Sequence, residues 1–548
     1  MKPLLKARIH TAVAAGLMGL AAMSTQIQAA DVSRNNLGQA LLFPYYTVNG
    51  NWATTFNVIN TGPRTLAVKV RFHEMKNSRD VLDFNIVLSP YDTWTGWVQD
   101  SDFGPELKTV DTSCTSPLDV RDPDVPVYAS NFAYTGAFDD TGGRGANRMR
   151  EGYVEVLLMG ESDPLVEDCS PTTPDTVTDC ANSALVPWSA KHVDGEPRDC
   201  VAVDNAFIAT APDWFDGDDP ATFVSAPPIA NSLAGSGDPL ARNDFVAPTE
   251  NWLKGNVGWL DAATGYGAGT EAIAIEDWAQ DNFVTAQQFP WFLEPTFATG
   301  ATLWTVDGAA EFERVVGASA TVNEWADNPN NGARTDWIVT FPTKAYHVDV
   351  FNEQIQAAVS KYRAALANVV SQAGDDTDAA VSACVADRSV CEVITANAPL
   401  AVEPFEALFG VQTAADGTGI SPVTVLWEYF DREEGTAVQA SEGTTISPAP
   451  PRPRVDIELN YEANVVTFAD TSVVNSNFAA SSGVADALPS ATSGWAKLSF
   501  SEALNPTTNN YELPVAAFAF RTIDRTLDGQ AYDSGYLPPT PTQPAPAQ

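Results

Sequence analysis

Short segments in which apolar and polar residues alternate recur at both ends of the chain, and they constrain its fold more than any other feature. Residues 66–73 (LAVKVRFH) and 82–88 (LDFNIVL) alternate in this way, with Asn77 and Ser78 between them as turn residues. A period of two residues is typical of a strand with one buried face. Further strands are expected at 55–59, 93–98, 423–429, 455–462, 494–500 and 514–520. The pattern predicts a mainly β protein with an antiparallel β-sandwich framework formed by the N- and C-terminal strands.

The regions between these ends have a different character. Residues 161–255 are rich in Asp, Pro, Ser and Thr, which is typical of long loops, and apolar residues in 351–370 follow helical spacing. The sequence therefore divides into a signal peptide 1–30, an N-terminal β-sandwich region 31–160, a loop-rich disulfide-pinned region 161–255, a mixed β region 256–350, a helical insertion 351–410, a C-terminal β region 411–535 and a disordered proline-rich tail 536–548.

Residues 1–30 have the features of an export signal. Lys2, Lys6 and Arg8 form a positive start, which an apolar core at 11–23 and the small-residue cleavage site Gln28-Ala29-Ala30 follow. We therefore expect the mature chain to act at the cell surface or in the extracellular space rather than in the periplasm. After residue 30 there is no apolar run of about 18 residues, so the sequence predicts no transmembrane helix in the mature chain.

The chain is strongly acidic, with 70 Asp and Glu against 30 Lys and Arg and a formal net charge of −40. Such a surface repels phosphate backbones, so nucleic acid is excluded as a partner. Acidic loops can instead bind calcium, which prefers several oxygen ligands. The best candidate is the loop DWFDGDD, with the carboxylates of Asp213, Asp216, Asp218 and Asp219. The spacing of these residues does not match an EF-hand, and a solvated acidic turn explains the loop equally simply. We therefore expect no cofactor, and calcium bound at this loop is the alternative.

The six cysteines are expected to form disulfides, because their number is even and the export signal implies an oxidising compartment. No CxxC pattern occurs and histidines are few, which disfavours zinc. Cys384 and Cys391 form a local pair that can close only if a helix breaks between them. The other four can pair in three ways, and the sequence leaves the choice open among Cys114, Cys169, Cys180 and Cys200.

Patterns of catalytic residues are absent from the sequence, which contains neither G-x-S-x-G nor HExxH. A carboxylate pair for glycoside hydrolysis could combine Glu428 with Asp456 or Glu458, but alternation places all three on the solvent side of their strands. We therefore expect a protein that is not an enzyme.

Aromatic residues suggest a weaker candidate for ligand binding. Trp94 and Trp97 lie three residues apart in one expected strand, so they point to opposite faces of a sheet. The exposed member of this pair could stack against a sugar ring or fill a subunit interface. Ordinary packing of both side chains is the alternative.

Self-association is the sharper hypothesis for a partner, besides a surface glycan. Residues 39–43 (QALLF) form an apolar strand close to the mature N-terminus, which could pair with the open sheet edge of a second copy. The alternative places this segment as a first strand inside its own sandwich.

Several segments resemble a family of uncharacterised exported cell-surface proteins of Gram-negative bacteria. The resemblance rests on LFPYYTV at 42–48, on residues 57–61 and 69–98, and on LNYEANVVTF at 459–468 and GWAKLSF at 494–500. It implies a secreted β-rich protein at the surface of a Gram-negative cell and no known reaction. We expect a non-enzymatic cell-surface or extracellular-matrix protein with a structural or adhesive role. The alternatives are a carbohydrate-binding or carbohydrate-active secreted protein and a calcium-stabilised surface protein.

Overall fold

The computed structural model describes residues 30–102, 104–121, 125–127, 142–172, 185–208, 244–278, 308–349, 419–432, 455–500 and 513–523, with short pieces at 140, 180, 183, 296–297, 405, 409, 526–527, 530–531, 534–536 and 542–543. This part of the chain is mainly β, and almost all of its strand pairs are antiparallel, which confirms the predicted fold class. The signal peptide to residue 29, nearly all of the expected helical insertion and most of the proline-rich tail lie outside the described residues.

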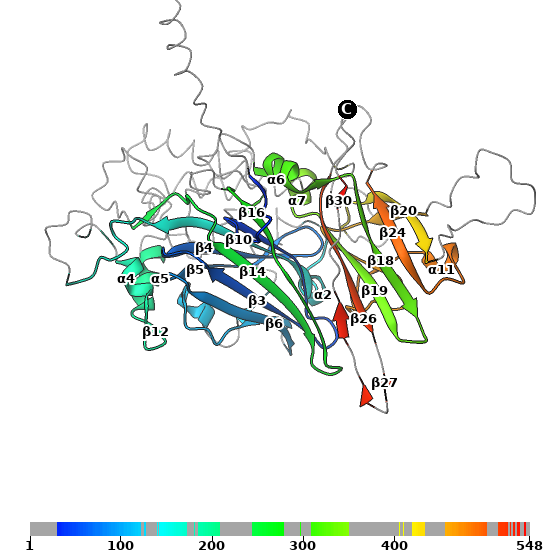
Figure 1. Ribbon diagram of the computed structural model, residues 1–548, viewed down its shortest axis with the longest axis horizontal. Coiled ribbons are helices and arrows are strands. Elements are labelled where there is room, and N and C mark those ends of the chain that lie inside the picture. Colours follow the sequence, from blue (N-terminus) through cyan, green and yellow to red (C-terminus); the bar gives the residue numbers. More distant parts are fainter. Residues whose placement is uncertain are drawn as a thin grey trace, which may run out of the picture.

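Two sheets face each other in what we call the N-terminal sandwich, on the left of Figure 1. The first runs in the order β1 (Asp31–Val32), β16 (Ile273–Glu276), β2 (Ala40–Thr47), β10 (Glu151–Ser162), β4 (Leu66–Glu74), β5 (Asp80–Leu88) and β8 (Cys114–Ser116), with β13 (Phe245–Val246) paired to β10. The second runs in the order β15 (Tyr266–Glu271), β14 (Leu253–Asp261), β3 (Trp52–Asn60), β6 (Thr93–Ser101), β7 (Gly104–Lys108) and β9 (Val125–Pro126).

Alternating side chains fill the space between these two sheets, as the period of two residues requires. Phe56 and Val58 of β3 meet Val70 and Phe72 of β4 in one hydrophobic core. Strand β4, however, is buried along its whole length, so its second face is also covered. A second cluster on that side of the sheet includes Trp278, Phe297 and Phe312.

Strand β2 lies in the interior of the first sheet and not at an edge. It pairs with β16 on one side and with β10 on the other, and all eight of its residues are buried. Its backbone groups are therefore used inside the molecule, and the segment 39–43 has no free edge for a second copy. The alternative of a strand inside its own sandwich is the arrangement found.

The C-terminal strands form a separate sheet, which we call the C-terminal sheet. Its order is β21 (Val455–Leu459), β20 (Val423–Asp431), β24 (Ser493–Ser499), β18 (Ala320–Asn328), β19 (Ala333–Thr340), β22 (Ala463–Thr467) and β23 (Ala480–Ser481), with β26 (Ala516–Ile523) paired to β19 and to β29 (Ser534–Tyr536), and β30 (Thr542–Gln543) paired to β18. The sheet folds over a core in which the rings of Trp337 and Trp427 lie 4.9 Å apart.

Strands β19, β22 and β26 form a wall that two cores share. Trp337 points into the core of the C-terminal sheet, whereas its neighbour Ile338 belongs to the core of the sandwich. Phe520 of β26 packs against Trp52 of β3, with ring centroids 5.2 Å apart. The N- and C-terminal strands therefore share one core, although among the described strands they do not pair within one sheet.

Disulfides and short elements complete the described part. Disulfides join Cys114 to Cys200 and Cys169 to Cys180, which selects one of the three pairings that the sequence left open. Cys384 and Cys391 lie outside the described residues. The remaining elements are η1 (Leu118–Arg121), α2 (Ala146–Met149), α4 (Val186–Ala190), β11 (His192–Val193), β12 (Glu196–Pro197), α5 (Cys200–Ile208), α6 (Gly308–Val316), β17 (Gly317–Ala318), α7 (Lys344–Val348), α11 (Val484–Ala487), β25 (Leu513–Pro514), β27 (Thr526–Leu527) and β28 (Gln530–Ala531).

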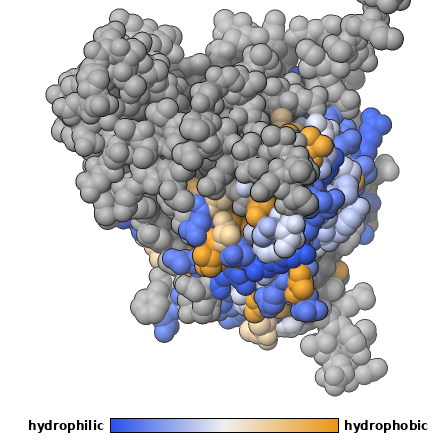
Figure 2. Space-filling view, turned by 90° about the vertical axis from the view of Figure 1, so that its left-hand side faces the viewer, coloured by the Kyte–Doolittle hydropathy of each residue, from blue (hydrophilic) through white to orange (hydrophobic). Residues whose placement is uncertain are grey.

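In the described part of the chain, every helix is too short or too polar to cross a membrane. Figure 2 shows the left-hand face of the molecule, where the coloured surface is mostly hydrophilic and its hydrophobic spots are small and separate. The hydrophilic colour of this face agrees with the strongly acidic composition of the chain.

Candidate functional site

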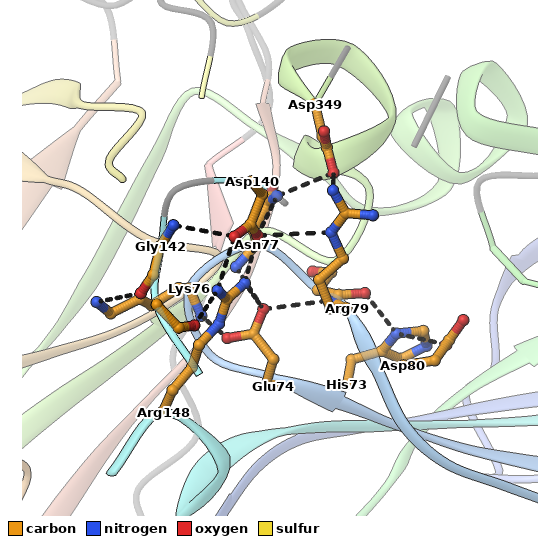
Figure 3. A network of polar contacts seen from close by, with 12 residues as sticks. His73, Glu74, Lys76, Asn77, Arg79, Asp80, Asp140, Gly142, Arg148 and Asp349 are labelled. Carbon is orange, nitrogen blue, oxygen red and sulfur yellow. Dashed lines mark hydrogen bonds and ion pairs between the residues drawn. The ribbon is translucent and has the colours of Figure 1, made fainter. Parts of the chain in front are cut away.

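A dense group of charged side chains surrounds the turn between β4 and β5, which is buried between the N-terminal sandwich and the C-terminal sheet (Figure 3). The sequence predicts this turn correctly at Asn77 and Ser78, and Ser78 adopts a left-handed φ of 52°. Turns of this kind usually lie at the surface. Here residues 75–79 are all buried. We call the polar contacts around this turn the charged junction.

The carboxylate of Glu74 organises the turn. It accepts hydrogen bonds from the backbone N–H groups of Lys76 at 2.7 Å, Asn77 at 2.9 Å and Arg79 at 3.1 Å. These bonds satisfy backbone donors that a hairpin of this length leaves without ladder partners. A charged side chain at the end of β4 thus replaces the solvent that would normally hydrate the turn.

Arg148 of α2 balances the negative charge on this side of the junction. Its guanidinium donates to Glu74 Oε1 at 2.7 Å and to Asp140 Oδ1 at 2.9 Å. Burial alone would raise the pKa of Asp140, but the hydrogen bonds and charge of Arg148 outweigh it and hold the pKa well below its usual range. Asp140 is therefore ionised and paired at neutral pH.

Two residues of the turn reach across to the C-terminal part of the chain. Asn77 donates through Nδ2 to Asp349 Oδ2 at 2.9 Å, and Arg79 Nη2 lies 2.9 Å from the same oxygen. Asp349 follows directly after α7. The backbone adds a further link, because Ala463 N–H at the start of β22 donates to the carbonyl of Met75 at 3.0 Å.

A second charged group lies on the face of β4 that points away from the sandwich core. Arg71 forms ion pairs with Asp80 and with Asp83, while the ring of His73 stacks on Tyr153 with centroids 4.9 Å apart. Burial would lower the pKa of His73, but the nearby carboxylates, led by Glu155 at 3.3 Å, raise it above its ordinary value. His73 is therefore held toward its charged form.

Glu462 is the buried acid whose ionisation is opposed most clearly. Burial raises its pKa to about 8, although Lys344 and the backbone N–H of Ala345 act in the opposite direction. Lys344 is itself buried, which lowers its pKa to about 8, and its Nζ donates to the carbonyl of Tyr461 at 3.2 Å. A neutral carboxyl is thus enclosed where the two β units meet.

This arrangement is suited to holding the two β units together. The charges of the junction are buried, and arginine meets carboxylate in nearly every case. Replacing water around such groups is costly, and the cost is offset only when the geometry of the pairs is good. Within the described residues, no three His, Cys, Asp or Glu side chains are arranged to hold a metal ion.

The structure separates the two tryptophans that the sequence singled out. Trp94 is buried in the sandwich core against Phe84, with ring centroids 5.6 Å apart. Trp97 lies on the other face of β6, is half-buried and donates its indole N–H to Gln99 at 2.8 Å. The candidate calcium ligands Asp213, Asp216, Asp218 and Asp219 lie outside the described residues.

The three candidate carboxylates of a hydrolase lie on the outer face of the C-terminal sheet. Glu428 is half-buried, and Lys497 is its cross-strand neighbour. Asp456 and Glu458 are exposed on β21. Their positions agree with the alternation of the sequence, which places all three on the outward side.

One exposed aromatic residue on this outer face was missed as a candidate. Trp495 of β24 is 40% exposed and stacks on Phe430 of β20. The signal was present in GWAKLSF, because Ala496 and Leu498 alternate inward and so direct Trp495 outward. The alternation in this segment predicts a strand, and the same alternation directs Trp495 to the exposed side of that strand.

Comparison with known proteins adds no family to these observations. No protein-family model, curated protein or solved structure matches the chain.

Proposed function

We propose that this chain is an exported, non-enzymatic cell-surface or extracellular-matrix protein with a structural or adhesive role. The observation that carries the proposal is the charged junction, which ties the N-terminal sandwich and the C-terminal sheet into one block. A protein that bears load or presents a surface to a partner needs a fixed relative orientation of its parts. The charged junction supplies it.

Several contacts beyond the turn support this rigidity. The indole N–H of Trp52 donates to the carbonyl of Val473 at 3.2 Å, and Thr340 donates to the carbonyl of Pro44 at 2.6 Å. Buried Glu151 of β10 accepts from Ser476 at 3.0 Å. Each bond joins residues far apart in the sequence, so separation of the two units would leave buried polar groups without partners, which is strongly unfavourable.

Disulfides support the extracellular half of the proposal. The Cys114–Cys200 bridge ties β8 to α5 and closes a loop of 86 residues, and the Cys169–Cys180 bridge pins a shorter one. Such bridges persist in oxidising compartments and are rare in the cytosol. Together with the export signal, they favour a location beyond the inner membrane.

The proposal can be tested in cells that produce the protein. Limited protease treatment of intact cells should digest the protein, while a cytoplasmic control protein stays intact. A deletion strain should attach less well to surfaces or form weaker aggregates, and complementation should restore this property. Complementation with Arg79→Met, which breaks the junction, should restore less than complementation with Arg198→Met, a surface change. Protection of the protein from protease, or unchanged attachment after deletion, would refute the proposal.

A further inference from the structure

The outer face of the C-terminal sheet carries an exposed aromatic pair. Trp495 and Phe430 are cross-strand neighbours on β24 and β20, and their rings lie parallel, 3.8 Å apart and inclined by 5°. The stacking of this cross-strand pair stabilises the sheet, and it still leaves 40% of the surface of Trp495 exposed to a ligand.

The aromatic pair stands on a rigid base. Strand β24 has partners on both sides, and Trp495 is paired with Glu324 of β18 as well as with Phe430. The indole of buried Trp325 donates to the carbonyl of Trp495 at 3.2 Å. A Cβ atom on Gly494 would lie 1.8 Å from the carbonyl oxygen of Phe430, so a glycine is needed for the close approach of the strands. A ligand would meet a surface that is already in place.

Polar groups of both signs surround the pair. Arg521 Nη1 forms an ion pair with Glu324 at 3.1 Å, and Arg432 donates to Ser493 at 2.9 Å. One row further along the sheet, Lys497 lies opposite Glu428. These side chains offer both donors and acceptors at the margin of the rings.

We propose that this face binds a neutral polysaccharide through contact of a hexose ring with the part of the Trp495 indole that Phe430 leaves uncovered. The apolar C–H face of a pyranose matches a flat indole, because aromatic side chains combine an apolar face with a polar edge. Sugar hydroxyls both donate and accept hydrogen bonds, and they match a margin that carries guanidinium, ammonium and carboxylate groups together. We call Trp495, Phe430 and this margin the aromatic platform.

Charge and size decide against other occupants. Asp456 and Glu458 are exposed on the same sheet, and the whole chain has a net charge of −40, so an anionic polymer would be repelled. A cationic polymer would be attracted by the net charge of the whole chain rather than by the rings, because Arg521 and Lys497 lie next to Glu324 and Glu428. A stable protein partner would need an interface of roughly 800 Å² on each side with an apolar centre. Among the described residues of the C-terminal sheet, Trp495 is the only large apolar side chain that is exposed, so the apolar centre is too small for such an interface.

This inference rests on the adhesive part of the proposed function and names a ligand class for it. Binding is measured with purified protein, so the result does not depend on where the protein lies in the cell. The mature protein is incubated with insoluble cellulose, curdlan and starch, with alginate beads and with chitosan beads, and the bound fraction is measured at several concentrations. We expect saturable binding to at least one neutral glucan and none to alginate, whereas chitosan should bind through the net charge of the chain and independently of Trp495.

Variants connect the binding to the aromatic platform. Trp495→Ala should weaken binding by about tenfold or more, the size expected from loss of one aromatic contact. Trp495→Phe keeps a ring against Phe430 and should lose less. Tyr91→Ala removes a more exposed aromatic ring at the other end of the molecule and should change nothing. Thermal unfolding of each variant shows whether it folds. If Trp495→Ala does not fold, the comparison of Trp495→Phe with the wild type tests the proposal.

Three results would overturn the inference. They are absence of binding to every neutral glucan, binding to charged polymers alone, and equal binding by the wild type and both Trp495 variants. Any of them would leave the proposed structural role standing, since that role is judged by protease accessibility and attachment of whole cells. If the deletion strain attaches less well but the purified protein binds no neutral glucan, the structural or adhesive role stands and the glucan proposal fails.

Discussion

Replacement of Glu462 by glutamine tests whether burial keeps this carboxyl neutral where the two β units meet. Burial raises the pKa of this carboxyl from 4.5 to about 8. In the unfolded chain the carboxyl loses its proton near pH 4.5, whereas in the folded protein it keeps the proton until about pH 8. Between these values the folded state binds more protons, so the free energy of unfolding falls as the pH rises.

The size of this effect follows from the shift. At 1.36 kcal/mol for each pKa unit, the change from 4.5 to about 8 corresponds to about 5 kcal/mol of stability lost across this pH range. Glutamine has nearly the same shape and does not titrate. We expect Glu462→Gln to match the wild type near pH 4.5 and to exceed it by up to about 5 kcal/mol near pH 8.

Neighbouring groups define the window of the measurement. Burial lowers the pKa of Lys344 from 10.5 to about 8, so this residue makes stability rise with pH, but only between about pH 8 and 10.5. Burial raises the pKa of Asp336 to about 6, which gives a falling contribution that is present in both proteins and cancels in their difference.

Urea unfolding followed by tryptophan fluorescence at pH 4.5, 6 and 8 measures the difference, with the disulfides intact. Glu458→Gln on exposed β21 serves as the control, and its pH dependence should parallel that of the wild type. Curves for Glu462→Gln and the wild type that stay parallel from pH 4.5 to 8 would show that burial does not hold this carboxyl neutral.

Two further predictions concern the charged junction and the disulfides. Arg148→Met leaves Glu74 and Asp140 buried without their cation and should lower the free energy of unfolding by about 3–5 kcal/mol, whereas the surface change Arg198→Met should have little effect. Replacing both cysteines of the Cys114–Cys200 bridge by serine should lower it by about 5 kcal/mol, because that bridge closes a loop of 86 residues. The same change at the Cys169–Cys180 bridge, with a separation of 11 residues, should lower it by about 3 kcal/mol. Urea unfolding checks both predictions, and equal losses for the two bridges would contradict the loop-entropy argument.

The sequence by itself determines the local features of this protein. The alternation in 66–73, 82–88, 423–429 and 494–500 places strands that the structure confirms, because a strand repeats every two residues whatever its partners are. The same alternation correctly directs Glu428 outward. An even number of cysteines predicts disulfides, and the described bridges confirm that expectation for four of them. Each of these inferences needs only neighbours along the chain.

The tertiary structure alone decides which strands pair and which faces are covered. Arg79 and Asn77 look like residues of a solvated turn, yet their partner Asp349 is about 270 residues away and meets them because the C-terminal end of α7 lies against the turn. Leu426 and Phe430 both alternate to the outer side of β20, but Leu426 is buried and Phe430 is half-exposed. Alternation sets the side of a sheet on which a residue lies. Whether that side meets solvent or protein depends on contacts between distant segments, and no local period records them.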